Sequence, residues 1–135
     1  MRDGYTKQFE ASEAPNDEFI EFQRCWVASI VVLSGDASGE EYSLDQSSTM
    51  LGRGESAHVR FEDASMSSEH VALEFFDGGI RLRDLGSMNG TLLNGSDTKA
   101  ATLKNGDRFQ IGALELQFIL TERPKKPKTY ELPVS

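Results

Sequence analysis

The chain has 135 residues, of which 38% are hydrophobic, and a formal net charge of −8. This length allows one domain with a core of moderate size and is too short for two. The negative charge argues against nucleic acid as a ligand, because Lys and Arg supply most of the affinity for a phosphate backbone. The single cysteine excludes an internal disulfide framework and is typical of a reducing, cytoplasmic compartment.

The first residues are acidic and show no sustained hydrophobic period. Residues 1–22 carry two basic and six acidic side chains, mixed with Gly, Pro and isolated aromatic residues. They lack the basic start and apolar centre of a secretory signal, and no apolar run in the chain is long enough to span a membrane. We predict a flexible acidic tail over residues 1–22, from which Phe19, Ile20 and Phe22 can still dock, in a cytoplasmic protein without a membrane partner.

The middle of the chain alternates apolar and polar side chains with a period of two, and no helical period persists. Trp26–Leu33 is a β-branched run, and Glu41–Leu44 is a short return strand. Val71–Phe75 and Ile80–Arg83 flank a Gly-rich turn and form the strongest hairpin signal, and Phe109–Leu120 continues the alternation. Short strands between Gly and Asn turns predict an all-β sandwich whose loops gather at its two ends.

The last residues are rich in proline and lysine. Residues 123–128 read Arg-Pro-Lys-Lys-Pro-Lys, and proline disfavours both helices and strand ladders. The sequence predicts a linker over residues 123–135 that leads to an output domain absent from this chain. A plain solvated tail is the alternative interpretation.

Six short motifs lie between these strands. In chain order they are Gly52-Arg53, Ser67-Ser68-Glu69-His70, Asn89-Gly90-Thr91, Asn94-Gly95, Leu103-Lys104-Asn105-Gly106-Asp107 and Ile111-Gly112. An arginine, a hydroxyl and an amide on neighbouring turns can hold a phosphothreonine, because the first two donate to phosphate and the third bonds the peptide backbone. This chemistry suits an adaptor rather than a catalyst.

The order of these motifs over about residues 26–120 resembles the forkhead-associated (FHA) domain. The resemblance implies a β-sandwich of about eleven strands in two sheets, with loops at one apex that bind phosphothreonine peptides. We therefore predict an FHA domain over residues 23–122, and the absence of a P-loop and of a metal-binding carboxylate cluster predicts no enzyme activity, metal or cofactor. The resemblance further implies phosphothreonine-containing protein partners and an upstream Ser/Thr kinase. Bacterial members are commonly fused to output domains such as nucleotide cyclases, including diguanylate cyclases.

The resemblance also implies roles for single residues. Arg53 is similar to the arginine that pairs with the phosphate, Ser67 to the serine that binds a phosphate oxygen, and Asn89 to the asparagine that bonds the ligand's main chain. Five further residues match positions that support the binding loops, namely Gly52, His70, Gly90, Thr91 and Asn94.

Two positions of the phosphopeptide site depart from the family pattern. Many members carry Arg, Lys or Asn where this chain has Ser68, and Thr or Ser where it has Met88. One lost charge-assisted hydrogen bond is worth roughly 1.5–3 kcal/mol, which weakens binding by about tenfold or more unless backbone N–H groups compensate. The acidic residues that flank the motifs favour peptides that are neutral or basic near the phosphate, and they are Glu55, Glu62, Asp63 and Glu69.

Two other functions remain open on the sequence alone. Ser68 and Met88 motivate a degenerate fold that binds proteins without phosphate. A more remote alternative is a hydrolase built from Ser67 or Ser68, His70 and Asp84, although the chain has no nucleophile elbow.

The ligand of the domain has a candidate within the chain itself. Thr6 lies in the predicted N-terminal tail with Phe9 three residues on, and the family often reads the residue three past the phosphothreonine. The rival phosphorylation site is Thr129, with Leu132 three residues on.

Overall fold

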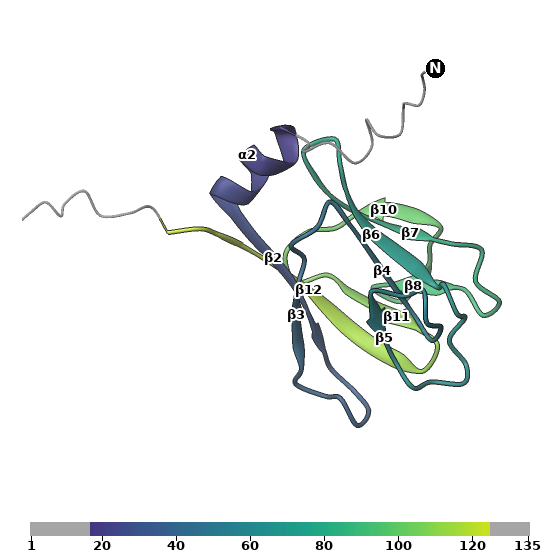
Figure 1. Ribbon diagram of the computed structural model, residues 1–135. Helices are drawn as coiled ribbons and strands as arrows, with labels where there is room; N and C mark the ends of the chain where they lie inside the picture. Colours follow the sequence, from purple (N-terminus) through teal and green to yellow (C-terminus); the bar gives the residue numbers. More distant parts are fainter. Residues whose placement is uncertain (1–16, 125–135) are drawn as a thin grey trace, which may run out of the picture.

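The computed structural model describes residues 17–124, which form two β-sheets and one helix (Figure 1). One sheet has the order β10-β7-β6-β4-β5, and the other has the order β3-β2-β12-β11-β8-β9. The predicted all-β sandwich of about eleven strands is therefore confirmed. The strands of the first sheet are β4 (Ser48–Gly52), β5 (Val59–Arg60), β6 (Val71–Phe76), β7 (Gly79–Asp84) and β10 (Ala100–Thr102). Those of the second are β2 (Trp26–Val32), β3 (Glu41–Ser43), β8 (Thr91–Leu93), β9 (Ser96–Asp97), β11 (Arg108–Ile111) and β12 (Leu114–Glu122).

Alternate side chains of the central strands form the core between the sheets. In β12, Leu114, Leu116 and Phe118 are buried and the residues between them are half-buried, as the period of two predicts. Leu73 and Leu82 face them from β6 and β7 and are also buried. Burial of each such side chain stabilises the fold by about 1.5–3 kcal/mol. The need to fill this core explains why apolar residues occupy every second position.

The predicted hairpin forms between β6 and β7. Asp77 and Gly78 occupy its turn with φ of 54° and 83°, and Phe76 pairs with Gly79. Positive φ at both central residues matches the twist of the flanking strands, and Asp followed by Gly suits it. Asp77-Gly78 was therefore a reliable local signal.

Helix α2 (Asp17–Cys25) corrects the placement of residues 17–22 in a flexible tail, in which no helical period was seen. Phe19 and Phe22 lie three residues apart, are buried, and pack against Phe75 with ring centroids 5.5 and 5.4 Å apart. Nine residues are too few to show a sustained period, and a helix this short is stabilised by tertiary packing. The aromatic residues looked isolated because their partner is more than 50 residues away.

The described helix is not long and apolar enough to cross a membrane. The two candidate phosphorylation sites, Thr6 and Thr129, and most of the predicted linker lie outside the described residues.

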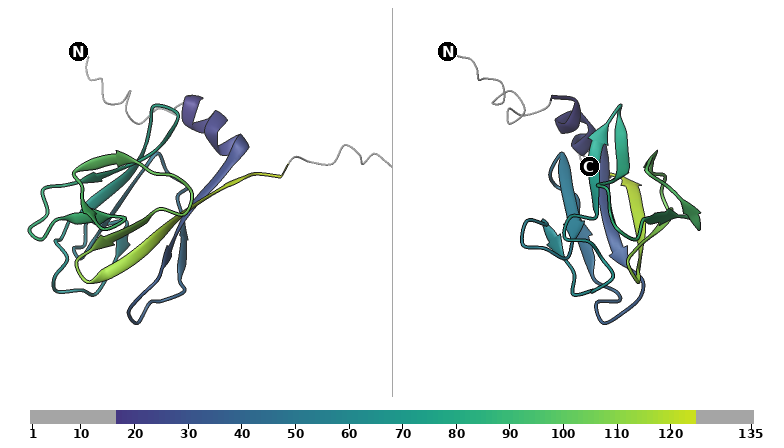
Figure 2. Two further views of the ribbon diagram at one scale, coloured as in Figure 1. Left: turned by 180° about the vertical axis from the view of Figure 1, so that it is seen from behind. Right: turned by 90° about the vertical axis from the view of Figure 1, so that its right-hand side faces the viewer.

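Three loops meet at the end of the sandwich opposite α2. They are the 53–58 loop between β4 and β5, the 61–70 loop between β5 and β6, and the 85–90 loop between β7 and β8. Figures 1 and 2 show these loops at one end and α2 beside the β6–β7 turn at the other. The Arg53, Ser67 and Asn89 motifs all fall on these loops.

Candidate phosphopeptide-binding site

The 53–58 and 61–70 loops are joined by backbone hydrogen bonds. The N–H of Arg53 donates to the carbonyl of Ser67 at 3.0 Å, and the N–H of Gly54 donates to the carbonyl of Ser68 at 3.1 Å. The N–H of His70 donates to the carbonyl of Leu51 at 2.9 Å. These bonds extend the pairing of β4 and β6 beyond the strands, and they hold Arg53 beside Ser67.

Gly52 permits this close approach. A Cβ atom at position 52 would lie 2.0 Å from the carbonyl oxygen of Ser68, a distance at which the atoms overlap. The glycine is therefore required by the contact between the two loops, which no local backbone conformation reveals.

His70 joins the 61–70 loop to the 85–90 loop. Its ring is fully buried, Nδ1 accepts the N–H of Ser67 at 3.0 Å, and Nε2 lies 2.8 Å from the carbonyl oxygen of Gly90. Because Nδ1 accepts, the proton is on Nε2, which donates to Gly90. Both ring nitrogens are thus occupied by backbone, and His70 positions two loops at once.

Asp84 organises the 85–90 loop from within. Its Oδ1 accepts the N–H groups of Gly86 and Ser87 at 2.7 and 2.8 Å, and its Oδ2 accepts the hydroxyls of Ser87 and Thr91, both at 2.7 Å. Sequence reasoning missed this role and used Asp84 only in a hydrolase alternative. The spacing Asp84-Leu85-Gly86-Ser87 was the available signal, because Asp accepting the N–H two residues on is the mark of an Asx turn.

These hydrogen bonds lower the pKa of Asp84. Burial alone would raise the pKa of Asp84, but the hydrogen bonds from Thr91, Ser87 and the backbone N–H groups outweigh it and lower the pKa to about 2. A free aspartate has a pKa of about 3.9. The ionised side chain therefore stabilises the fold fully above pH of about 4, and this contribution is lost as the pH falls toward 2.

Substituting Asp84 with asparagine is expected to lower the free energy of unfolding at pH 7 by about 1–3 kcal/mol, because an amide cannot accept four donors. The variant should also lose less stability than the wild type between pH 4 and 2. Thermal unfolding across this pH range measures both effects. Asp36→Asn is the matched control, since Asp36 is exposed and makes no hydrogen bond with the described residues. Equal stability losses in the two variants would contradict this role for Asp84.

Arg53, Ser67 and Asn89 are each anchored by one hydrogen bond. Nε of Arg53 donates to the carbonyl of Met66 at 2.9 Å, Oγ of Ser67 accepts the N–H of Met88 at 3.0 Å, and Nδ2 of Asn89 donates to the carbonyl of Ser65 at 2.8 Å. Within the described residues, the Nη groups of Arg53, the hydroxyl proton of Ser67 and Oδ1 of Asn89 have no hydrogen-bond partner. The three side chains are thus oriented by the protein and keep free polar groups.

The two positions that depart from the family pattern lie at the edge of this site. Ser68 is exposed, and Met88 is 87% exposed with its N–H already used by Ser67. The N–H groups of Ser68, Glu69 and Asn89 donate no hydrogen bond to the described residues. These backbone donors are available where the side-chain donors are missing.

Arg60 is a second arginine that sequence reasoning missed. It lies opposite Gly52 in the parallel pairing of β4 with β5, and its Nε donates to the carbonyl of Arg53 at 3.0 Å. This places the Arg60 guanidinium against the backbone of Arg53. No local signal marks it, because the pairing of β4 with β5 brings residues eight apart side by side.

The acidic residues around the site do not all act as free charges. Asp63 accepts from the N–H and hydroxyl of Ser65 at 2.9 and 2.6 Å, and from the N–H of Ala113 at 2.9 Å. The hydrogen bond from the Ser65 hydroxyl is the main reason that the pKa of Asp63 is lowered. Asp63 therefore ties the 61–70 loop to the β11–β12 turn, whereas Glu55 and Glu62 are exposed and make no such bonds with the described residues.

The remaining candidates divide between the site and other parts of the fold. Thr91 is buried and donates to Asp84, and Gly90 accepts from His70 with a φ of 82°. Asn94 instead lies in the β8–β9 turn, where its amide bonds Asp107 and the N–H of Arg108 at 3.1 and 3.0 Å. The structure does not bring Asn94 together with the binding loops.

The geometry does not support the hydrolase alternative. Both ring nitrogens of His70 bond backbone atoms, and Oγ of Ser67 contacts the N–H of Met88. Asp84 binds Ser87 and Thr91 instead of His70. Among the described residues, no group of three or more His, Cys, Asp or Glu is placed to hold a metal ion.

Comparisons with known proteins identify relatives of this chain. Residues 31–122 match a family model described as the cytoplasmic domain of the inner membrane component of T3SS. The chain is 35% identical over 92 residues to the glycogen accumulation regulator GarA of Mycolicibacterium smegmatis, covering 68% of this chain and 58% of the relative. It is 31% identical over 115 residues to the oxoglutarate dehydrogenase inhibitor of Corynebacterium glutamicum, covering 84% of this chain and 80% of the relative.

A solved structure is similar over the same region. It is the structure of an FHA domain whose interactions are phosphothreonine-dependent. Its sequence is 29% identical to this chain, and the two structures superpose with a TM-score of 0.63. The match covers 69% of this chain and 95% of that one. The chain thus spans nearly all of a solved FHA domain and a little more than half of the mycobacterial regulator.

Proposed function

We propose that this chain, which belongs to the forkhead-associated (FHA) family, is a phosphothreonine-dependent protein-interaction module. One observation carries the proposal. Three loops are held together by Gly52, His70 and Asp84, and they present free polar groups of Arg53, Ser67 and Asn89 at one apex. A preorganised site of this kind avoids the cost of ordering long side chains on binding.

Each of the three side chains has a distinct task in the proposed complex. The guanidinium of Arg53 pairs with phosphate through its Nη groups, and the hydroxyl of Ser67 donates to a second phosphate oxygen. Oδ1 of Asn89 accepts from the main chain of an extended peptide. The exposed Glu55 and Glu62 disfavour acidic peptides, so we propose ligands that are neutral or basic around the phosphothreonine.

Titration with matched peptide sets tests this function. The protein is titrated with one peptide library in three forms, containing phosphothreonine, phosphoserine or threonine at the fixed position. We expect the phosphothreonine form to bind at least about tenfold more tightly than the threonine form, as one charge-assisted hydrogen bond alone requires. Equal affinities for the phosphorylated and unphosphorylated forms would instead support the phosphate-independent platform that Ser68 and Met88 motivate.

We further propose that the chain regulates other proteins and has no catalytic activity of its own. The two relatives described above are named a regulator and an inhibitor, and the side chains of Ser67, His70 and Asp84 bond other partners instead of one another. An upstream Ser/Thr kinase would then control when the partner binds. The linker and the output domain beyond residue 122 remain predictions.

The N-terminal segment of the chain is one proposed ligand, through a phosphorylated Thr6. Helix α2 shortens the tether, because ten residues separate Thr6 from Asp17 at the end of the sandwich opposite the loops. Ten extended residues reach about 35 Å, which exceeds the roughly 20 Å length of β6, so binding within one chain or between two chains is geometrically allowed.

A synthetic peptide of residues 1–12 with phosphorylated Thr6 is expected to bind the unphosphorylated full-length chain in calorimetry. The unphosphorylated peptide should bind at least about tenfold more weakly, since the Arg53 contact requires the phosphate. A peptide of residues 124–135 with phosphorylated Thr129 is the comparison, and tighter binding of that peptide would assign the role to the other segment. No dependence on phosphate in either peptide would exclude self-recognition.

A further inference from the structure

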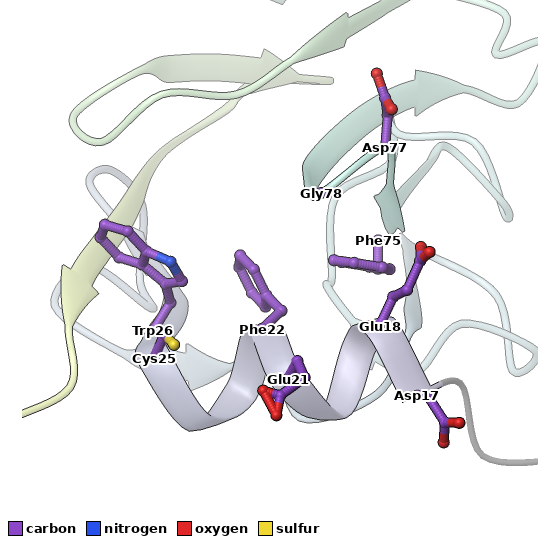
Figure 3. A pocket seen from close by; sticks show the side chains of 9 residues that line it. All are labelled: Asp17, Glu18, Glu21, Phe22, Cys25, Trp26, Phe75, Asp77 and Gly78. Carbon is purple, nitrogen blue, oxygen red and sulfur yellow. The ribbon is translucent and has the colours of Figure 1, made fainter.

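A groove lies between helix α2 and the β6–β7 turn, at the end of the sandwich remote from the phosphopeptide loops. Its volume is about 630 Å³. The aromatic side chains of Phe22, Trp26 and Phe75 face the same space from the helix, from β2 and from β6 (Figure 3). Phe22 is buried, but Trp26 is 37% exposed, so the groove presents apolar surface to solvent. Apolar surface collected in a groove is typical of a docking site.

The rim of this groove is acidic. Asp17, Glu18 and Glu21 extend from α2, and Asp77 lies across from them at the β6–β7 turn (Figure 3). Glu21 forms an ion pair with Arg24 at 2.9 Å, but both side chains are largely exposed, so this pair neutralises little of the rim. An apolar floor with a negative rim selects a segment that carries both lysines and apolar side chains.

Residues 125–135 have this composition. Lys125, Lys126 and Lys128 are followed by Tyr130, Leu132 and Val134, with a single acidic residue among them. Residues 1–16, by comparison, carry two basic and three acidic side chains, so they have no net positive side-chain charge to match the rim. Charge therefore favours the C-terminal segment over the N-terminal one.

The segment also begins beside the groove. Glu122, the last residue of β12, pairs with Trp26, and the N–H of Arg123 donates to the carbonyl of Cys25 at 2.7 Å. Nε of Arg123 donates to the carbonyl of Gln23 at 2.9 Å. Cys25 lines the groove and also a second hollow that it shares with Arg123 and Pro124, so the chain leaves the described fold at the C-terminal end of α2, next to both hollows.

We propose that residues 125–135 dock in this groove of the same molecule, with the lysines on the acidic rim and an apolar side chain against Trp26. Eleven extended residues span about 35 Å, whereas nine helical residues of α2 span about 13 Å, so the segment can follow the whole groove. Attachment at Arg123 raises the effective concentration to about the millimolar range, which suits contacts that are individually weak. Docking here leaves the phosphopeptide loops free, because they lie at the other end of β6.

The groove contains the only tryptophan and the only cysteine of the chain, which allows a direct test. Acrylamide quenching of Trp26 fluorescence and alkylation of Cys25 are measured on the full-length chain and on a variant with Lys125→Gln, Lys126→Gln and Lys128→Gln. If the segment is docked about half of the time, its release should raise both rates roughly twofold. High salt should have the same effect on the wild type and little effect on the variant.

Substitutions in the groove separate docking from other causes. Glu21→Gln combined with Asp77→Asn should reproduce the effect of the lysine variant, and the two sets together should give no further change, as expected for groups that act on one another. Asparagine tolerates the positive φ of 54° at position 77. Glu115→Gln, at a half-buried acidic residue on β12 outside the groove, is the matched control and should change neither rate.

Two outcomes would overturn the proposal. The first is identical quenching and alkylation in the wild type and in the lysine variant. The second is protection that grows with protein concentration, which would show that the segment of a second copy occupies the groove.

Discussion

Replacing Arg53 with alanine is expected to abolish phosphothreonine dependence while the protein remains folded. Of the Arg53 side chain, only Nε bonds the described residues, so the substitution removes one part-buried hydrogen bond and should cost about 0.5–1.5 kcal/mol of stability. In the proposed complex the Nη groups contact the phosphate, and the loss of charge-assisted hydrogen bonds worth about 1.5–3 kcal/mol should lower affinity by about 10- to 150-fold. Calorimetric titration with a phosphothreonine peptide library measures the affinity, and thermal unfolding measures the stability.

A lysine at position 53 separates charge from geometry. Arg53→Lys retains the positive charge but has neither the planar fork nor the Nε donor to Met66, so we expect affinity between those of the wild type and the alanine variant. Arg108→Ala is the matched control, because the Arg108 side chain is 58% exposed on β11. Unchanged phosphopeptide affinity in Arg53→Ala, or an equal loss in Arg108→Ala, would mean that the phosphate binds elsewhere.

Replacing Gly52 with alanine is expected to damage both the fold and the site. The added Cβ would lie 2.0 Å from the backbone oxygen of Ser68, so the 61–70 loop must move and its hydrogen bonds to Arg53 and Gly54 must weaken. Overpacking typically costs 1–3 kcal/mol, and contact with a backbone atom places this case at about 3 kcal/mol or more. Thermal unfolding should show a fall in Tm on the order of 10 °C, and phosphopeptide binding should fall with it.

Two other glycines provide a graded comparison for Gly52→Ala. A Cβ at Gly54 would lie 2.8 Å from Cβ of Ser68, so Gly54→Ala should have an intermediate effect. A Cβ at Gly79 would have only an ordinary contact of 3.8 Å with Thr102, so Gly79→Ala should be close to neutral. The same Tm for the Gly52 and Gly79 variants would show that the two loops adjust freely, which is incompatible with a preorganised site.

The Gly52→Ala variant also tests whether the two proposed binding regions are independent. If the loops lose their order in Gly52→Ala but α2 and its groove remain, phosphopeptide binding will fall while the proposed docking of the C-terminal segment persists. The two sites lie at opposite ends of β6, and their separation makes such a result measurable within one protein.

Local features of the sequence were sufficient to predict the sandwich and the order of its binding motifs. Alternation in Phe109–Leu120 reports which face of a strand is buried, because successive side chains point to opposite faces. Asp77-Gly78 reports a hairpin, because the turn requires positive φ at both positions. These properties depend on neighbouring residues alone, so they can be read without knowing the rest of the fold.

Contacts between distant residues were decided only by the tertiary structure. Helix α2 depends on Phe75, Arg60 reaches Arg53 through the parallel pairing of two short strands, and Asp63 bonds Ala113, which is 50 residues away. The reason for Gly52 is likewise a contact with Ser68, not its own backbone conformation. No periodicity or turn rule encodes such contacts, because they arise when loops separated in sequence are packed against one another. The sequence alone was therefore enough to propose which residues bind phosphate, whereas the packing of three loops decided how those residues are held.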